Sequence, residues 1–419
     1  MKYEPVNVGR WLLWGATALV FLAAPHVFSG GFALTMLIQM GTMIIFALSY
    51  NMLLGQGGML SFGHAVYSGL GAYLSVHALN LMGKGALPFP VTLLPLIGGL
   101  SGLAFGVLFG YVTTRRAGTT FALISLGIGE MVFACVLMFP GFFGGEAGVS
   151  TNRVIGQAFL GITYGPAIQV YYLVAVWCFL CVVAMFALTQ TPLGRMANAV
   201  RDNPERAEFV GYDTQKVRFL QLVLSSFFAG VAGALSCINF EIVSAENVSA
   251  LRSAGVLMAT YIGGVPFFPG PILGAIVFIF FVVALSGFTK AWLLYLGLFF
   301  VTMVVYAPGG IASILLMQIP VLRARRLGEL AGPYALAAGA ALVTMIGVIG
   351  IVEMVYRLSE QGASTVLSVL GVSFDARSVA PWVVWGLVFA AGLFALRFAA
   401  RRVRERWDAI QFDLQSRAA

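Results

Sequence analysis

The chain of 419 residues is 60% hydrophobic and only 10% charged, and its formal net charge at pH 7 is +8. One soluble core cannot bury this much apolar surface, so most of it must face lipid, and soluble enzymes are excluded. A basic excess in a membrane protein reports the bias of cytoplasmic loops toward Lys and Arg, so it does not indicate nucleic-acid binding.

Hydrophobic runs bounded by charges, proline or glycine predict an all-α polytopic membrane protein with twelve transmembrane helices. Six crossings precede a polar loop and six follow it. The run at 253–264 is shorter than the ~20 residues of a full crossing, and its length alone also fits a re-entrant segment. In chain order, the predicted crossings cover residues 11–28, 32–54, 58–80, 90–113, 119–139, 169–189, 219–240, 253–264, 271–287, 291–307, 334–356 and 380–400.

The distribution of basic residues favours counting 253–264 as a crossing. With twelve crossings, 18 of the 24 Lys and Arg residues lie on one side of the membrane, together with both termini. The positive-inside rule makes that side cytoplasmic. The basic residues on the opposite side are Lys84, Arg153, Arg252, Lys290, Arg357 and Arg377.

Residues 55–71 contain six glycines and several polar side chains. Small residues recur every four positions along this stretch, and such a face lets another helix approach closely. Helix packing is therefore the first interpretation. Because the polar groups are unsuited to lipid, an irregular or cavity-lining start of the third helix is the alternative. The packing candidates are Gly57, Ala65 and Gly69, and the candidates for a translocation path are Gln56, Ser61 and His64.

Glu130 is an acidic residue near the middle of the predicted fifth crossing. A charged carboxylate in hydrocarbon costs about 2.5 to 3.5 kcal/mol on insertion scales, so Glu130 should face the bundle interior, pair with another group or be protonated. A structural hydrogen bond to another helix and a role in the translocation path are both open.

Residues 190–218 form a polar, charged loop inside an otherwise apolar chain. Acidic residues at helical spacing predict a short amphipathic helix within it. Pro204 is tolerated in a first turn, and Gly211 permits a sharp turn. This composition suits docking to a soluble partner, with a solvated loop as the alternative. The docking candidates are Arg195, Arg201, Asp202, Asn203, Pro204, Glu205, Arg206, Glu208 and Gly211.

Neither catalytic nor metal-binding signals stand out. The four cysteines lie in apolar stretches, which indicates neither a disulfide framework nor a metal site. The sequence contains no Gly-x4-Gly-Lys-Ser/Thr phosphate loop, so ATP hydrolysis must come from another chain. We therefore expect no catalytic residue, metal ligand or cofactor in this chain.

Short motifs follow one another in a fixed order: Asn51–Gly55, Ser61–Ala65, Gly71–Tyr73, Phe121–Glu130, Gly144–Gly148, Thr191–Arg195, Arg201–Asn203, Phe228–Ala234, Ile262–Gly264, Gly270–Ala275 and Ala307–Gly310. With these motifs the chain resembles the inner-membrane permease subunits of bacterial branched-chain amino acid ABC importers. The similarity covers about residues 35–315. Two features depart from the family pattern: the segment Val265–Pro269 replaces a small polar linker, and residues 323–419 extend past the usual end.

The resemblance implies a type II-like ABC importer permease, with a ten-helix core in residues 1–320. Residues 321–419 would add a transmembrane hairpin and a basic cytoplasmic tail. The loop 190–218 would be a coupling loop that sits in a cleft of a cytoplasmic ATPase. The motif glycines assigned to helix packing are Gly230, Gly233, Gly263, Gly264 and Gly274.

The resemblance also implies a location in the bacterial inner membrane and a set of partners. These are a related permease forming a heterodimer, two cytoplasmic ATPases that bind ATP and Mg²⁺, and a periplasmic solute-binding protein. The expected function is ATP-driven import of branched-chain amino acids or a related small solute, without chemistry on it. A passive channel or ion-coupled secondary transporter, for a small polar solute such as urea or an amide, and a membrane assembly subunit without transport function are the alternatives.

Overall fold

The computed structural model describes residues 8–154, 161–359, 366–369 and 372–418. Eight helices in these ranges are long and apolar enough to cross a membrane, or nine if α13 and α14 count as one bent span. A helical polytopic membrane protein is thereby confirmed. The chain divides into two compact units, one of residues 1–288 with 296–313 and one of residues 289–295 with 314–419.

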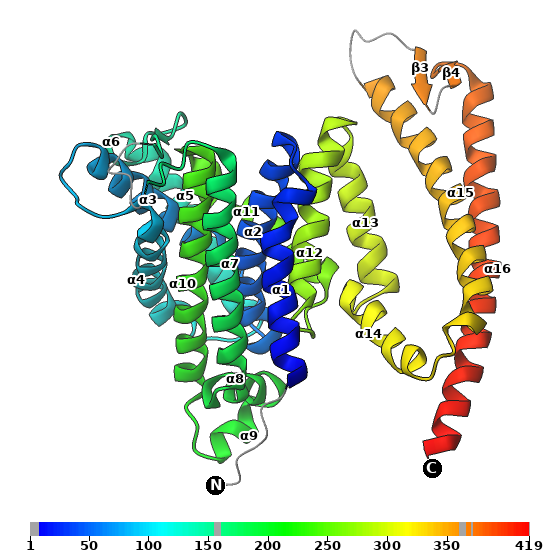
Figure 1. Cartoon of the computed structure of the whole chain (residues 1–419), viewed down its shortest axis with the longest axis horizontal. Coiled ribbons are helices and arrows are strands. Elements are labelled where there is room, and N and C mark those ends of the chain that lie inside the picture. The colour runs from blue at the N-terminus through cyan, green and yellow to red at the C-terminus, as the bar shows by residue number, and fades with distance from the viewer. Residues whose placement is uncertain (1–7, 155–160, 360–365, 370–371, 419) are drawn as a thin grey trace. The chain divides into compact units, whose positions relative to one another are not determined.

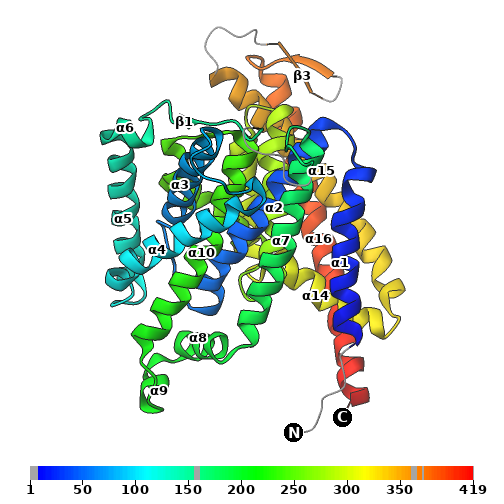
Figure 2. The same cartoon turned by 60° about the vertical axis from the view of Figure 1, so that its left-hand side comes forward.

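The first unit is a helix bundle with short helices and strands at its two ends (Figure 1). The pair α8 and α9 lies at one end, and β1 and α6 lie at the other (Figure 2). Its long helices are α1 Val8–Val27, α2 Gly31–Asn51, α3 Ala65–Gly83, α4 Leu94–Thr113, α5 Thr119–Met138, α7 Ala167–Gln190, α10 Thr214–Phe240, α11 Ala250–Gly263 and α12 Gly270–Ile279. Its shorter elements are η1 Met52–Gln56, η2 Val91–Leu93, α6 Pro140–Phe143, β1 Val149–Ser150, α8 Pro192–Asp202, α9 Pro204–Phe209, β2 Ile242–Val243, η3 Ala245–Val248, η4 Phe280–Ala284 and η5 Leu285–Gly287.

Helix α10 is the core of this bundle, and it packs closely against α3 and α4. A Cβ on Gly233 would overlap the carbonyl oxygen of Ser68 in α3, and one on Gly230 would overlap that of Gly98 in α4. Neither position has room for any side chain. The backbones therefore approach as closely as small-residue interfaces between membrane helices allow.

A similar close approach joins α11 to α12. Gly263 faces the carbonyl oxygen of Gly270, and Gly274 faces that of Ala259. Gly264 ends α11 with a φ of +119°, a conformation that an L side chain rarely adopts. These contacts turn the chain back on itself between two short helices.

The third long helix begins at Ala65, seven residues after the start of the crossing predicted at 58–80. The second helix continues into a π-helical turn, η1, and residues 57–64 have no regular helix before α3 starts at Ala65. The small residues at four-residue spacing therefore do not share one helical face, because only Ala65 and Gly69 lie on α3. The glycine-rich, polar composition disrupts the helix there instead of building a packing stripe.

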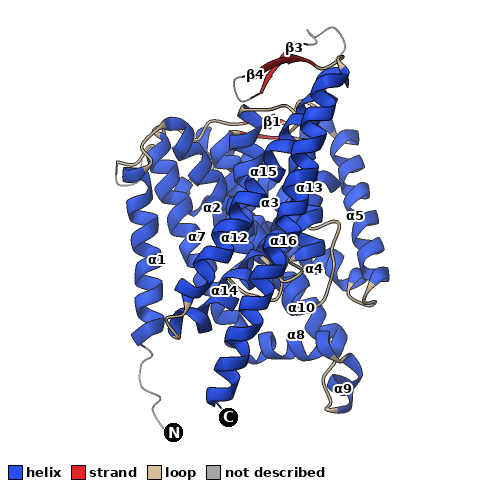
Figure 3. Cartoon of the chain, turned by 90° about the vertical axis from the view of Figure 1, so that its right-hand side faces the viewer, coloured by secondary structure: helices blue, strands red, loops and turns tan. Residues whose placement is uncertain are grey.

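The second unit is a long helical hairpin of α15 Leu327–Ser359 and α16 Val379–Ala418. The strands β3 Val366–Val369 and β4 Val372–Asp375 pair antiparallel at its tip (Figure 3). Gly347 and Gly350 of α15 pack on Phe389 and Trp385 of α16. At the other end of the hairpin, Arg326 forms a 2.8 Å ion pair with Asp413.

Two features in the C-terminal third of the chain differ from the predicted crossings. α13 Trp292–Tyr306 is followed after a short break by α14 Gly310–Arg323, where no helix was predicted. The strands β3 and β4 were also not predicted. Further toward the N-terminus, α11 has 14 residues and, like the predicted run at 253–264, is shorter than the ~20 residues of a full crossing.

Candidate functional site

The loop 190–218 folds into two short helices at one end of the bundle. Thr191 caps α8, and the helix buries Gly194, Ala197 and Val200 at a spacing of three residues. This face packs on Val217 of α10. The buried face fixes α8 to the membrane bundle and leaves Arg195 and Asp202 exposed to solvent.

Asn203 separates the two short helices. Its φ of −156° and ψ of 95° are extended, and its side-chain oxygen accepts a 2.9 Å hydrogen bond from the Arg206 backbone nitrogen. The acidic residues at helical spacing are therefore divided between the two short helices. Asp202 ends α8, whereas Glu205 and Glu208 lie on α9.

The chain reverses after α9 and enters α10. Gly211 has a φ of +92°, which favours glycine. Asp213 then caps α10 by accepting a 3.0 Å hydrogen bond from the Lys216 backbone nitrogen. This bond and a second one to the Lys216 side chain hold the pKa of the Asp213 carboxyl below its ordinary value. Glu208 accepts a 2.8 Å hydrogen bond from Thr214, which ties α9 to the same helix start.

An apolar tip on this polar loop was not identified from the sequence. Phe209 is 90% exposed and Val210 is 71% exposed, beside a half-exposed Tyr212. Large apolar side chains exposed among charges mark a protein contact, and aromatic anchors carry much of the energy of such contacts. The signal in the sequence was a Phe-Val pair directly before the turn glycine.

Arg201 connects α8 to the irregular segment between α2 and α3. Its guanidinium donates to the backbone carbonyl of Gly55 in η1, and it also pairs with Asp202 at 2.8 Å. Gly58 has a φ of +64°, and a Cβ there would lie 2.7 Å from Cγ of Arg201. Arg195, Arg201 and Arg206 are all exposed, but Arg201 reaches the helix bundle through its hydrogen bond to Gly55.

The irregular segment 57–64 is held by polar groups from several helices. Tyr50 of α2 donates a 3.0 Å hydrogen bond to the Ser61 carbonyl, and Ser49 lies 3.0 Å from Nε2 of His64. From other helices, Ser125 accepts from the Phe62 backbone nitrogen and Ser253 from that of Ala65, each at 3.0 Å. Segments of α2, α5 and α11 therefore meet at this one stretch of backbone.

Three of the four path candidates lie in or beside this segment. Ser61 and His64 are fully buried, and His64 stacks on Phe46 at 5.6 Å between ring centroids. Gln56 accepts a 3.2 Å hydrogen bond from Gln221, which also donates to the Met52 carbonyl at 2.9 Å. These groups brace the break in the helix pair with hydrogen bonds that hydrocarbon cannot supply.

Glu130 lies apart from the other three. Its side chain is exposed on α5, so it does not face the interior of this chain. Of the alternatives expected for it, the interior position is wrong. Pairing with another group and protonation stay predictions for Glu130.

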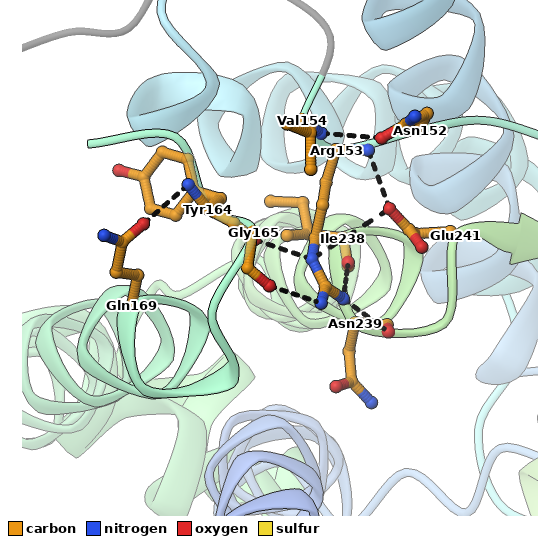
Figure 4. Close-up of polar contacts among 9 residues, drawn as sticks. All are labelled: Asn152, Arg153, Val154, Tyr164, Gly165, Gln169, Ile238, Asn239 and Glu241. Carbon is orange, nitrogen blue, oxygen red and sulfur yellow. Dashed lines mark hydrogen bonds and ion pairs between the residues drawn. The ribbon is translucent and has the colours of Figure 1, made fainter. Parts of the chain in front are cut away.

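Arg153 fastens the loop before α7 onto the end of α10 opposite α8 and α9 (Figure 4). Its Nε donates to the Tyr164 carbonyl at 2.7 Å, and its Nη1 donates to the carbonyls of Ile238 and Asn239 at 3.4 and 3.2 Å. Its backbone nitrogen donates to Glu241 at 2.9 Å. A cation at the last turn satisfies helix carbonyls that have no partner within the helix.

Replacing Arg153 with Gln should loosen this loop. Hydrogen bonds to a charged group are worth about 1.5 to 3 kcal/mol, so amide hydrogen exchange in 149–154 and 161–166 should accelerate about tenfold or more. The exposed Lys84 gives a matched control, since Lys84→Gln also removes one cation from this end of the bundle. Equal exchange in the Arg153 variant and the wild type would show that the loop is held by other contacts.

This architecture, apolar spans with a pair of short polar helices at one end, is that of a membrane permease. The family model for the branched-chain amino acid transport system permease component matches residues 32–307. The chain belongs to this family, and it is a transport subunit without enzymatic function.

Proteins similar in sequence to this chain are named as permeases of branched-chain amino acid transport systems. The high-affinity branched-chain amino acid transport system permease protein LivM of Escherichia coli is 29% identical over 307 residues, which cover 68% of this chain and 71% of LivM. The corresponding protein BraD of Pseudomonas aeruginosa is 22% identical over 245 residues, covering 56% of this chain and 79% of BraD. LivH of Salmonella typhimurium is 24% identical, with 56% of this chain and 79% of LivH covered. No solved structure matches.

Proposed function

We propose that this permease imports branched-chain amino acids, or a related small amphipathic solute, across the bacterial inner membrane. A second related permease, two cytoplasmic ATPases that bind ATP and Mg²⁺, and a periplasmic binding protein would complete the transporter. The names of the relatives support the substrate class. Family membership supports the need for partners, because this sequence contains no phosphate-binding loop of its own.

The connection from α8 through Arg201 to Gly55 carries the proposal. The nine docking candidates of the loop 190–218 would contact the ATPase together with the exposed tip at Phe209 and Val210. Movement of α8 by the ATPases would displace the η1 carbonyl that Arg201 holds. The hydrogen-bonded segment 57–64 would then re-aim α2, α5 and α11, as alternating access requires.

The test is the energy source of transport. In proteoliposomes containing the whole transporter, leucine uptake should require ATP on the side of the membrane that carries the ATPases. It should also require the leucine-loaded binding protein on the opposite side. It should persist when ionophores collapse all ion gradients. Uptake driven by an ion gradient without ATP would support the secondary transporter instead, and downhill flux without either would support the channel.

The distribution of Lys and Arg residues supports a proposed orientation of the chain in the membrane. With twelve crossings, the crowded side, which holds 18 of 24 basic residues, would be cytoplasmic, with both termini on that side. A reporter fused after Gly148 should therefore be active outside, and reporters fused after Asp202 and Arg325 should be active inside. Alkaline phosphatase and green fluorescent protein fusions measure the two states. A cytoplasmic signal at Gly148 would contradict the order of the first five crossings.

We also propose that residues 321–419 are accessory to transport. The family match ends at residue 307, and α15 and α16 pack mainly on each other. A chain ending at Gln318 should still insert and assemble with its ATPases, because two crossings are removed together and the topology of the rest is kept. Co-purification of the ATPases with the shortened chain checks this. Loss of assembly would make the hairpin part of a subunit interface.

A further inference from the structure

A cavity of about 540 Å³ lies within the first unit, between α2, α10, α11, α12 and the tip of α5. Its volume is within the range of about 300 to 1,000 Å³ that small-molecule sites occupy. None of the residues predicted to line the translocation path borders it. Its wall is mostly apolar, with a small number of polar groups, as expected of a ligand site.

Arg252 is the cation of this wall. It is partly buried, and its guanidinium lies 5.9 Å from the ring centroid of Phe46. Nη2 donates to Ser236 at 3.3 Å, but the buried Nε has no partner. Among the described residues, no carboxylate lies within ion-pair distance of Arg252. A buried guanidinium left in this state is short of acceptors, and a carboxylate matches its geometry with two parallel hydrogen bonds.

Glu246 lines the same cavity from the turn before α11. In the described part of the chain, it forms no ion pair with Arg252 or with any other cation. The exposed Glu246 and the partly buried Arg252 thus line one cavity without forming an ion pair with each other. Arg252 is therefore available to an anionic group of a ligand, and Glu246 to a cationic group.

The rest of the wall combines apolar and aromatic side chains with five polar ones, which are Gln39, Thr42, Asn239, Asn247 and Ser249. Phe46, Phe133 and Phe278 border the cavity with Met43, Ile279 and Val282. These six apolar side chains bury a branched aliphatic group favourably and offer it no hydrogen bond.

We infer that this cavity binds a zwitterionic amino acid with an apolar side chain. Arg252 and Ser236 receive the carboxylate, Glu246 receives the ammonium group, and the aromatic wall receives the side chain. The inference rests on the proposed import function and adds to it a substrate site in the permease itself. A partly buried cation with an unpartnered nitrogen beside an apolar cavity is the kind of polar group that fixes the orientation of a ligand.

Three ligands separate the contributions of the two charges: L-leucine, L-leucinamide, which lacks the carboxylate, and 4-methylvalerate, which lacks the ammonium group. Binding is measured calorimetrically on the assembled transporter without nucleotide and without the binding protein. Wild type should bind leucine about tenfold or more tighter than either analogue, because each analogue loses a charge-assisted contact. Lys84→Gln, which removes a cation at the same end of the bundle, should keep this pattern.

The variants should lose discrimination selectively. Arg252→Gln should bind leucine and leucinamide equally well, while leucine stays ahead of 4-methylvalerate. Glu246→Gln should show the reverse pattern, and Arg252→Lys should restore part of the preference for the carboxylate if Arg252→Gln is poorly folded. Full discrimination in Arg252→Gln, or an equal loss for all three ligands, would overturn the site. ATP-driven leucine uptake that persists alongside either result would leave the proposed function standing.

Discussion

Replacing Arg201 with alanine should abolish most ATP-driven uptake while the protein remains in the membrane. The variant removes the side chain that joins α8 to the Gly55 carbonyl, but it leaves the buried face of α8, with Ala197 and Val200, in place. Hydrogen bonds from a charged donor contribute about 1.5 to 3 kcal/mol, so the ratio of solute moved to ATP hydrolysed should fall about tenfold or more. Parallel assays of leucine uptake and ATP hydrolysis in proteoliposomes measure this ratio.

Two controls separate coupling from docking and from folding. Arg116→Ala removes an exposed cation of the α4–α5 turn and should leave the ratio unchanged. Arg201→Lys keeps the charge but lacks the planar guanidinium, so it should fall between wild type and Arg201→Ala. If Arg201→Ala loses its ATPases on purification, the residue acts in docking, and if the ratio is unaltered, the contact with Gly55 does not transmit the movement.

Replacing Gly233 with alanine should destabilise the permease, contrary to the usual effect of this substitution in a helix. Alanine in place of glycine ordinarily stabilises a helix interior by about 1 kcal/mol. At Gly233 the added methyl would overlap the Ser68 carbonyl, so α10 and α3 must separate. Overpacking costs about 1 to 3 kcal/mol, and separating these helices would also disturb the neighbouring contact of Gly230 with α4.

Gly297 is the matched control for this prediction, because a Cβ there meets nothing within 4 Å. Gly297→Ala should leave the thermal midpoint in detergent unchanged or raise it, whereas Gly233→Ala should lower both the midpoint and the yield of folded protein. A Gly233→Ala variant as stable as Gly297→Ala would mean that the α3–α10 interface is looser than its geometry indicates.

The positions of the long helices could be predicted because hydrophobic length is a local property, but the twelve predicted crossings compare with eight or nine described helices long and apolar enough to cross a membrane. The loop 190–218 was recognisable for the same reason, since its polarity contrasts with everything around it. For the start of the third helix, the sequence left packing and an irregular backbone as alternatives, because the competition between the two at 57–64 is decided by distant partners. Ser125 and Ser253 hold this segment from two other helices, and no local pattern reveals that they do.

Sites assembled from distant parts of the chain escaped prediction more completely. Arg153 lies in a polar loop, and only the fold brings it to the carbonyls of Ile238 and Asn239. Arg252 was assigned only to a side of the membrane, although its orphaned guanidinium nitrogen borders a cavity. For Glu130, chemistry alone favoured the interior, but the helix face it occupies on α5 is set by the packing of its neighbours.

Helix α10 joins both ends of the first unit in one uninterrupted element. It has 27 residues, about 40 Å at 1.5 Å per residue, and it begins at the Asp213 cap beside α9 and ends under Arg153. A displacement at either end of such a continuous helix can move the other end. If docking of a solute-loaded protein at the Arg153 end favours one setting of α10, binding of the ATPases at the other end must be altered by the same factor, because linkage is reciprocal. Binding of the solute-loaded protein on one side of the membrane would then change ATPase binding on the other side through the tilt of a single helix.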